Sequence, residues 1–543
     1  MSTATTRETR DGLVASHVSV TDRSGAVILD DVSVSARSGR TLVIVGESGA
    51  GKSMLARTLC ALTPSALVAS GAVSLGGETF DLAADQARLK KQRGGGIVWL
   101  PQDPFTSLAP TLPCGEQISA ARTGRRSERA QRSRELLADV GLDARVARSY
   151  PHELSGGMRQ RVAIASALDS EPRVLIADEP TTALDVTTQR DILTLLTSLR
   201  DERAMTLVLV THDLALARQF GDDVIVMKDG QIVEEGPVNE VLASPRHEYT
   251  KRLSDAEPRI DGPNPREGKS TPAGAETIVE VRDLTKVFRS RKDSHVALMD
   301  VSLEIARAES IGIVGESGSG KSTVANIILN LIDPTSGKVF HDGVDLSTLG
   351  PKELFALRRI MQPVFQNPYG SLDPMYSIFR VVEEPLRVHG IGTAKEREAR
   401  VAELLDMVSL PRSVMRRYPH ELSGGQRQRV AIARALALKP EIVVLDEAVS
   451  ALDVLVQAQI LRLLSDLQAE LELTYLFITH DLAVVRQIAD DVVVMEHGRI
   501  VESGAADELF ANPRQDYTRE LIRAVPGAGI DLYGDEAPSR TES

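Results

Sequence analysis

The sequence predicts two consecutive α/β domains, each with a mixed, mainly parallel β core, an antiparallel β subdomain and a helical subdomain. The pattern G-x-x-x-x-G-K-S occurs twice, as GESGAGKS at 46–53 and as GESGSGKS at 315–322. After the first copy, the short apolar runs VLIA, TLVLV and DVIVM alternate with helical patterns, and the second half repeats the arrangement. Such alternation is typical of parallel strands joined by crossover helices.

Each glycine-rich stretch lies between a strand-like apolar run and a helix-like apolar run, which is the context of a phosphate-binding loop. The glycines let backbone N–H groups point inward at phosphates, and the start of the following helix adds partial positive charge. We expect Lys52 and Lys321 to bridge the β- and γ-phosphates of ATP, and Ser53 and Ser322 to bind Mg²⁺. The predicted loop residues are Gly46, Glu47, Ser48, Gly49, Ala50, Gly51, Lys52, Ser53 and Met54, and Gly315, Glu316, Ser317, Gly318, Ser319, Gly320, Lys321, Ser322 and Thr323.

The repeat fixes the predicted domain organisation as residues 13–253 and 277–524. Three pairs of equivalent residues lie 268 positions apart, namely Ser155 and Ser423, Glu179 and Glu447, and His212 and His480, and the loop lysines lie 269 apart. One duplicated fold explains this regular spacing. Residues 254–276 contain four prolines and three glycines, which indicates a flexible linker. The N-terminal segment 1–12 and the tail 525–543 are expected to be disordered.

Composition narrows the class of protein. A formal net charge of −13 argues against a nucleic-acid-binding surface as the main function. The two cysteines, Cys60 and Cys114, fit no metal-binding spacing and are typical of a reducing compartment. The N-terminus is polar, and no apolar run reaches the length of a membrane-spanning helix. These features predict a cytosolic chain that meets a membrane only through partners.

Polar residues end the apolar runs on which catalysis is expected to depend. VLIADE and IVVLDE each place an Asp and a Glu at a strand end, where the Asp can hold Mg²⁺ and the Glu can deprotonate the attacking water. A His after TLVLVT and TYLFIT and a Gln in WLPQDP and PVFQNP end further strands, close to the expected γ-phosphate. The predicted catalytic residues are Glu179, Glu447, His212, His480, Gln102 and Gln366. The predicted Mg²⁺ ligands are Ser53, Ser322, Gln102, Gln366, Asp178 and Asp446.

The sequence YPHELSGGMRQRVAIASAL from Tyr150 and its twin from Tyr418 place Ser-Gly-Gly at the start of an amphipathic helix. Bare N–H groups at such a start form a second anion-binding element in each half. With this element added, residues 13 to 523 resemble the ATP-binding subunits of ABC transporters, because the order, spacing and flanks of the motifs agree in both halves.

The resemblance implies that the two halves form a head-to-tail intramolecular dimer with two shared ATP sites. Ser423, Gly424 and Gly425 would close the site of Lys52, and Ser155, Gly156 and Gly157 would close the site of Lys321. Asp185 and Asp453 match the loops that cross between halves. Closing on ATP and opening after hydrolysis would be the mechanical output.

Phe288 matches the aromatic residue that stacks on adenine in the family, whereas the aligned position of the first half is Asp22. We therefore expect weaker adenine binding at the first site. Members of this branch often carry C-terminal cysteines that hold an iron–sulfur cluster. Neither tail contains a cysteine, and no cluster is expected.

The segments PQDPFTSLAP, FQNPYGSLDP, HEYTKRL and QDYTREL resemble the dipeptide, oligopeptide and nickel importer branch. The resemblance implies two polytopic permeases, an extracytoplasmic solute-binding protein, no nucleic-acid partner, and a place at the cytoplasmic face of the membrane. Phe105 and Tyr369 would anchor the permeases, and Trp99 would report movement of the loop that follows it. The alternative is a soluble tandem ABC ATPase in translation or DNA repair, and an exporter ATPase is a third possibility.

Overall fold

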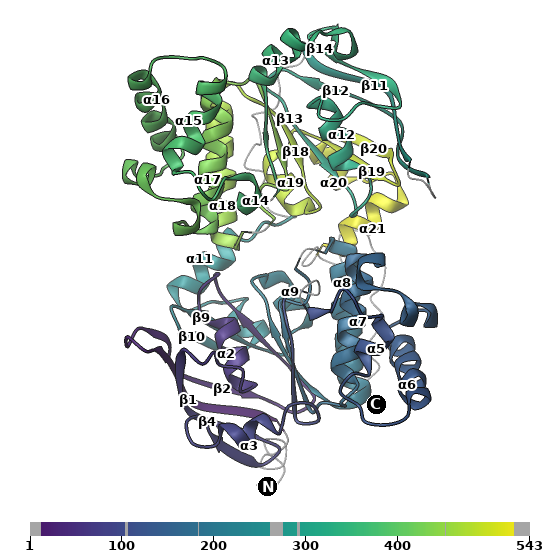
Figure 1. The fold of residues 1–543 in the computed structure, drawn as a ribbon, viewed down its shortest axis with the longest axis vertical. Coiled ribbons are helices and arrows are strands. Elements are labelled where there is room, and N and C mark those ends of the chain that lie inside the picture. Colours follow the sequence, from purple (N-terminus) through teal and green to yellow (C-terminus); the bar gives the residue numbers. More distant parts are fainter. Residues whose placement is uncertain are drawn as a thin grey trace. The chain divides into compact units, whose positions relative to one another are not determined.

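The apolar runs form two sheets in each half of the computed structural model, which describes residues 12–103, 107–182, 184–260, 275–289, 294–366, 368–450 and 452–525. The chain divides into two units, Met1–Glu257 and Pro258–Ser543 (Figure 1). In each unit a six-stranded sheet is parallel apart from one antiparallel edge strand, and a four-stranded sheet is antiparallel. This confirms the predicted fold class.

The larger sheet of the first unit has the strand order β10-β9-β3-β8-β7-β6. Every residue of β3, β7 and β8 is buried, because a parallel strand in the middle of a sheet is covered on both faces. The strands are β3 (Thr41–Val45), β6 (Ile97–Leu100), β7 (Val174–Asp178), β8 (Thr206–Val210), β9 (Asp223–Lys228) and β10 (Gln231–Pro237).

The smaller sheet of the first unit has the order β2-β1-β4-β5 and joins the same core. Its inner residues, those of helix α2 and those of the larger sheet form one buried cluster. Helix α2 therefore packs against both sheets and fixes the loop that precedes it. The elements are β1 (Leu13–Asp22), β2 (Val27–Ala36), α2 (Lys52–Leu59), β4 (Leu67–Leu75) and β5 (Glu78–Asp81).

The charge-rich segment after the first sheets forms the helical subdomain that the sequence predicts. It contains α5 (Cys114–Ile118) and α6 (Arg126–Asp139), which pack beside α7 (Gly156–Leu168). The remaining helices of this unit are α3 (Gln86–Lys90), α8 (Val186–Arg203), α9 (Leu214–Phe220), α10 (Val238–Val241) and α11 (Glu248–Ala256).

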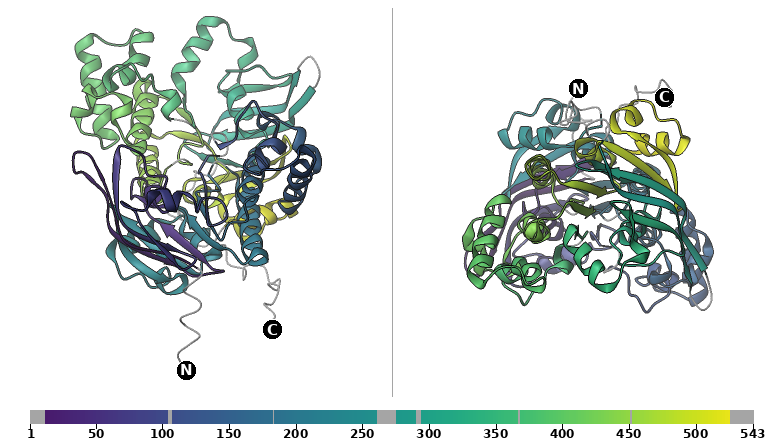
Figure 2. Two further views of the ribbon diagram at one scale, coloured as in Figure 1. Left: turned by 60° about the horizontal axis from the view of Figure 1, so that its bottom comes forward. Right: turned by 90° about the horizontal axis from the view of Figure 1, so that it is seen from above.

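The second unit repeats this arrangement, with sheets β12-β11-β14-β15 and β16-β17-β18-β13-β19-β20. Figures 1 and 2 show helices α15, α16 and α17 together on one side of the unit, away from the antiparallel strands. The strands are β11 (Thr277–Arg289), β12 (Ser294–Ala306), β13 (Ser310–Val314), β14 (Ser336–His341), β15 (Val344–Asp345), β16 (Met361–Val364), β17 (Ile442–Asp446), β18 (Thr474–Ile478), β19 (Asp491–Glu496) and β20 (Arg499–Ala505). The helices are α12 (Lys321–Ile328), α13 (Pro351–Ile360), α14 (Pro368–Ser371), α15 (Ile378–Val388), α16 (Ala394–Met407), α17 (Gly424–Ala435), α18 (Val454–Leu471), α19 (Leu482–Ile488), α20 (Ala506–Ala511) and α21 (Asp516–Ala524).

The structure moves one predicted boundary. Helix α11 extends to Ala256, inside the segment predicted as linker. The guanidinium group of Arg218 contacts both Glu257 and Ser254, and these contacts hold the end of the helix against the unit. Residues 1–11, 261–274 and 526–543 lie outside the described residues, as does Phe105. Within the described ranges, no helix is long and apolar enough to span a bilayer.

Candidate nucleotide-binding sites

The two glycine-rich loops have the backbone geometry that the motif predicts. Gly46 has φ 151°, and a Cβ atom there would lie 2.3 Å from the carbonyl oxygen of Met227. Gly51 has φ 96°, and a Cβ atom there would lie 2.7 Å from the side chain of Leu29. Only glycine fits such positions without displacing its neighbours. The loop is therefore fixed between strand β3 and helix α2.

The loop lysines bond the backbone of their own loops. Lys52 Nζ donates hydrogen bonds to the carbonyl oxygens of Gly46, at 2.7 Å, and Glu47, at 2.9 Å. Lys321 Nζ makes the equivalent bonds to Gly315 and Glu316 at 2.7 and 2.8 Å. Both lysines are almost completely buried. Each ammonium group is thus held at the mouth of the loop, in reach of an incoming phosphate.

A serine hydroxyl and a strand-end carboxylate meet beside each loop. Ser53 Oγ donates to Asp178 Oδ1 at 3.0 Å, and Ser322 Oγ donates to Asp446 Oδ1 at 3.2 Å. Burial raises the pKa of both aspartates, and the hydrogen bonds from the serines offset part of that rise. A bound cation would compensate this burial, so the hydroxyl–carboxylate pair fits an Mg²⁺ ion shared with phosphate oxygens.

A glutamate follows each aspartate in a strained backbone conformation. Glu179 and Glu447 both have φ 46°, in the left-handed region that non-glycine residues seldom occupy. Such strain gathers at functional positions, where the surrounding structure holds the residue in place.

Two predicted residues converge on each of these glutamates. Gln102 Nε2 donates to Glu179 Oε2 at 2.6 Å, and His212 Nδ1 lies 3.4 Å from Glu179 Oε1. In the second unit the structure brings Gln366 to 2.5 Å and His480 to 3.3 Å from the carboxylate of Glu447. The sequence predicted that the three residues of each set end strands close to the expected γ-phosphate, and the structure brings their side chains together.

In each of these sets the glutamate and the histidine shift each other's pKa in opposite directions. Burial alone would raise the pKa of Glu179, but the hydrogen bond and charge of His212 outweigh it and hold that pKa below its ordinary value. Burial alone would lower the pKa of His212, but the bond and charge of Glu179 raise it above its ordinary value. Glu447 and His480 shift in the same directions for the same reasons. The lowered pKa favours the unprotonated carboxylate of each glutamate, which its histidine and glutamine hold in place.

Few side chains beside the loops could bind a metal ion. Within the described ranges there is no cluster of three or more His, Cys, Asp or Glu side chains suited to a metal ion. Mg²⁺ is typically held by one or two protein oxygens together with substrate phosphates. A serine hydroxyl, an aspartate and a glutamine amide beside a phosphate loop fit that mode, and they do not fit a metal bound by protein ligands alone.

The Ser-Gly-Gly elements begin helices as predicted. Ser155 Oγ accepts a hydrogen bond from the N–H of Met158 and caps α7, and Ser423 caps α17 through the N–H of Gln426, both at 3.3 Å. The two glycines of each turn have different surroundings. A Cβ atom on Gly157 would lie 2.6 Å from Thr188 Cγ2, whereas one on Gly156 would approach Leu184 no closer than 3.3 Å.

Three further predicted residues have described local roles. Asp185 and Asp453 cap α8 and α18 by accepting hydrogen bonds from the N–H groups of Thr188 and Val456. Phe288 of β11 is 44% exposed, with Lys286 Nζ 5.1 Å from its ring centre. In the first unit the carboxylate of Asp22 instead accepts hydrogen bonds from the N–H groups of Ser24 and Ala26 and closes a turn.

Sequence reasoning missed one contact at the first site. Thr182 Oγ1 donates to Glu179 Oε2 at 3.1 Å, beside the bond from Gln102. The signal was the TT pair directly after ADEP, which the second half replaces by VS. The hydroxyl of the corresponding Ser450 donates to the backbone carbonyl of Glu447 and leaves the carboxylate to its other partners.

Two protein-family models match the chain, and both agree with this geometry. "ABC transporter" matches residues 29–182 and 298–450, and "Oligopeptide/dipeptide transporter, C-terminal region" matches residues 233–293 and 501–541. The chain belongs to the ABC transporter family of ATP-binding proteins. It is an ATPase and the energy-coupling subunit of an ABC importer of the oligopeptide and dipeptide branch, which decides between the alternatives left open by the sequence.

Two curated relatives match over nearly their whole length. The chain is 44% identical to the peptidoglycan transport ATP-binding protein YejF of Agrobacterium fabrum over 512 residues, which cover 92% of this chain and 93% of the relative. It is 42% identical to the glutathione import ATP-binding protein GsiA of Escherichia coli strain K12 over 565 aligned positions, which cover 95% of this chain and 90% of the relative. The tandem arrangement is thus shared with both relatives.

Proposed function

We propose that the chain hydrolyses MgATP at two sites and thereby drives a permease complex that imports peptides or peptide-like solutes. The observation that carries this proposal is the Gln–Glu–His set beside each phosphate loop, present in full in both units. Glu179 and Glu447 would each take a proton from the attacking water. The names of the relatives, which refer to peptidoglycan and glutathione, support a peptide-like solute.

The donors beside each loop would divide the remaining work. Lys52 and Lys321 would neutralise the phosphates, while Ser53 with Asp178 and Ser322 with Asp446 would hold Mg²⁺. Gln102 and Gln366 would complete the set from the neighbouring strand. Bound Mg²⁺ would neutralise phosphate charge. The protein side chains would position the attacking water and accept its proton.

The Ser-Gly-Gly turn of each unit would close the ATP site of the other. The cap made by Ser155 or Ser423 leaves a helix start whose N–H groups can face phosphate. Asp185 and Asp453, which begin helices directly after the catalytic segments, would sense whether the opposite site is filled. Phe288 would stack on adenine at the site of Lys321.

The ATPase of an importer works with membrane permeases, and we propose two of them together with an extracytoplasmic solute-binding protein. A cleft of about 680 Å³ in the second unit is lined by Gln366 and Asp446 and also by Phe365, Val388 and His389. The first unit has a cleft of about 710 Å³ lined by Ser53, Asp178, Gln102 and Trp99. The cleft of the second unit combines ATP-site residues with the exposed apolar side chains of Phe365 and Val388. A short helix of a permease would dock there, at the cytoplasmic face of the membrane.

The permease contact is tested by an acidic substitution in the cleft of the second unit. Val388→Asp should abolish copurification with the permeases and keep basal ATP hydrolysis, because Val388 is 57% exposed and the change leaves the core intact. Val344→Asp is the matched control, since Val344 is 49% exposed on β15, in the antiparallel sheet. Equal assembly of the two variants would contradict this docking site. Tyr369 and Phe105 are the predicted aromatic anchors. The side chain of Tyr369 and the whole of Phe105 lie outside the described residues.

A further inference from the structure

A tyrosine in the first turn of the last helix of each unit contacts the phosphate loop. The hydroxyl oxygen of Tyr249, in α11, accepts a hydrogen bond from the backbone N–H of Glu47 at 2.9 Å. In α21, the hydroxyl oxygen of Tyr517 accepts one from the N–H of Glu316 at 3.1 Å. The two units make this contact independently, at equivalent positions of the repeat.

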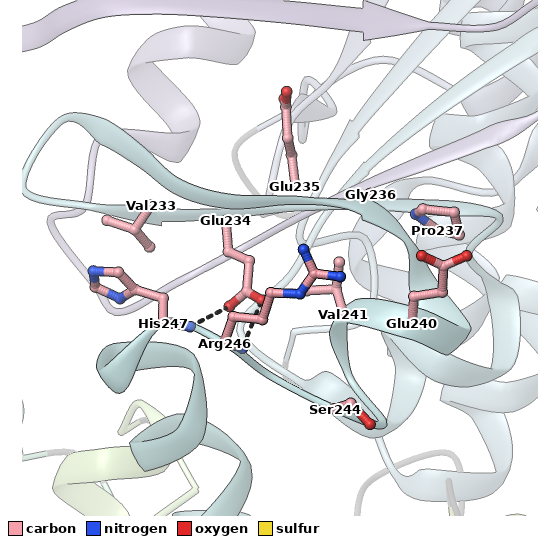
Figure 3. Close-up of a pocket in the computed structure, with 10 residues that line it drawn as sticks. All are labelled: Val233, Glu234, Glu235, Gly236, Pro237, Glu240, Val241, Ser244, Arg246 and His247. Carbon is pink, nitrogen blue, oxygen red and sulfur yellow. Dashed lines mark hydrogen bonds between the residues drawn. The ribbon is translucent and has the colours of Figure 1, made fainter.

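A glutamate on the edge strand fixes the start of each of these helices. Glu234 of β10 accepts hydrogen bonds from the N–H groups of Arg246, at 2.8 Å, and His247, at 3.1 Å (Figure 3). Figure 3 also shows Glu235 pointing away from that segment, on the other side of the strand. Glu502 of β20 makes the same pair of bonds to Arg514 and Gln515 at 2.7 and 3.1 Å. Strand β10 pairs with β9, which pairs with β3, the strand that leads into the loop.

The two tyrosine rings have different surroundings, so the hydroxyl bond to the loop is the feature that the two units share. Lys228 Nζ lies 5.4 Å from the ring centre of Tyr249, whereas Glu496 occupies the equivalent place in the second unit. The side chain of Tyr249 is 3% exposed, while Tyr517 is only half-buried. A tyrosine needed only to fill the core would not require the same hydroxyl bond in both settings.

The peptide group that donates this bond, between Gly46 and Glu47, is held on two sides. Its N–H donates to Tyr249, and its carbonyl oxygen, that of Gly46, accepts a hydrogen bond from Lys52 Nζ. If a phosphate drew the lysine away, the carbonyl would lose that partner. The bond to the tyrosine, on the other side of the peptide group, would still hold the loop.

We propose that Tyr249 and Tyr517 are positioning residues that hold the two phosphate loops in the shape that accepts a nucleotide. The C-terminal region of each unit, which contains the glutamate, the helix start and the tyrosine, thereby sets nucleotide affinity. This inference rests on the proposed binding of ATP phosphates by the two loops. Neither tyrosine touches the reacting atoms.

The test uses Tyr249→Phe, Tyr517→Phe and the double variant of the full chain, with Tyr475→Phe as matched control. Tyr475 is 1% exposed and its hydroxyl donates to the carbonyl oxygen of Leu464 at 2.9 Å, away from the loop. Trp99, the only tryptophan, lines the first cleft and reports MgADP and MgATP binding by fluorescence. Loss of one hydrogen bond to the loop should weaken the binding of both nucleotides by roughly three- to tenfold.

We expect Tyr249→Phe to weaken the titration reported by Trp99 and to raise KM for ATP with little change in kcat. The control should leave nucleotide affinity unchanged while lowering the unfolding temperature as much as Tyr249→Phe does. Unchanged affinity in Tyr249→Phe, or an equal loss of affinity in Tyr475→Phe, would overturn the proposal.

Two further measurements keep the test decisive. Lys52→Ala should abolish the Trp99-reported titration; if it does not, the proposed phosphate role of the loop fails, whatever the tyrosine variants show. Hydrogen exchange of the unaltered chain without nucleotide should find the Glu47 and Glu316 amides protected by roughly tenfold more than those of Ser48 and Ser317. Fast exchange at Glu47 and Glu316 would overturn the inference without any variant.

Discussion

Replacing the second glycine of a Ser-Gly-Gly turn by alanine should destabilise its unit by overpacking. A Cβ atom built on Gly425 lies 2.4 Å from Cγ1 of Val456 in α18. A valine in a helix has one strongly preferred rotamer, so this neighbour cannot turn away without cost. Overpacking of this kind costs about 1–3 kcal/mol, and the higher helix propensity of alanine returns at most about 1 kcal/mol. We expect Gly425→Ala to lower the free energy of unfolding by about 1–2 kcal/mol.

The assay is a double-mutant cycle read by thermal unfolding of the full chain. Val456→Ala removes the atom that the new Cβ meets, so adding Gly425→Ala to that background should cost little further stability. Gly424→Ala is the control, because a Cβ atom there lies 3.8 Å from Leu452, an ordinary contact. A Gly425→Ala chain as stable as the native one, or a cost that persists in the Val456→Ala background, would refute the packing argument.

The same cycle separates packing from nucleotide contact. If Gly425 serves only packing, ATP hydrolysis returns with stability in the double variant. The proposed closing of the opposite ATP site predicts instead that hydrolysis stays low in Gly424→Ala, although that variant folds normally. Full activity of Gly424→Ala would count against the proposed approach of this turn to a phosphate.

Three further predictions concern the chemistry of the sites. Glu179→Gln and Glu447→Gln should each slow hydrolysis, and the double variant should lose roughly 10²- to 10⁴-fold in kcat while still binding nucleotide; if one single variant abolishes all turnover and the other changes nothing, the two sites are not equally competent. The pair of His212 with Glu179 should stabilise the chain most at about pH 6, between the ordinary glutamate pKa of 4.5 and the ordinary histidine pKa of 6.5, and this effect should be lost as pH rises through the raised histidine pKa. The loss of unfolding temperature in Glu179→Gln should therefore be larger at pH 6 than at pH 9, and equal losses would contradict the ion pair. Phe288→Ala should weaken ATP binding at the second site by roughly tenfold or more through lost stacking, and an unchanged affinity would show that adenine rests elsewhere.

Local pattern was sufficient to predict the main elements of the fold and the polar residues that end the strands of each larger sheet. Continuous apolar runs such as TLVIV are buried on both faces only in the middle of a parallel sheet, so they identify β3 and its neighbours. The glycine spacing of the loop admits few backbone conformations, because a side chain at Gly46 would collide with the adjacent strand. Because the domain is duplicated, the sequence presents every motif twice, and each copy supports the interpretation of the other.

Only the tertiary structure determined which side chains touch. Gln102, Glu179 and His212 end different strands, and their contact depends on the order β6-β7-β8, which no local pattern specifies. The bond from Glu47 to Tyr249 joins residues 202 positions apart. The hydrogen-bond partners of loop residues depend on which strands lie side by side in the sheet. That strand order is determined by the burial of apolar residues throughout the unit and not by any single segment.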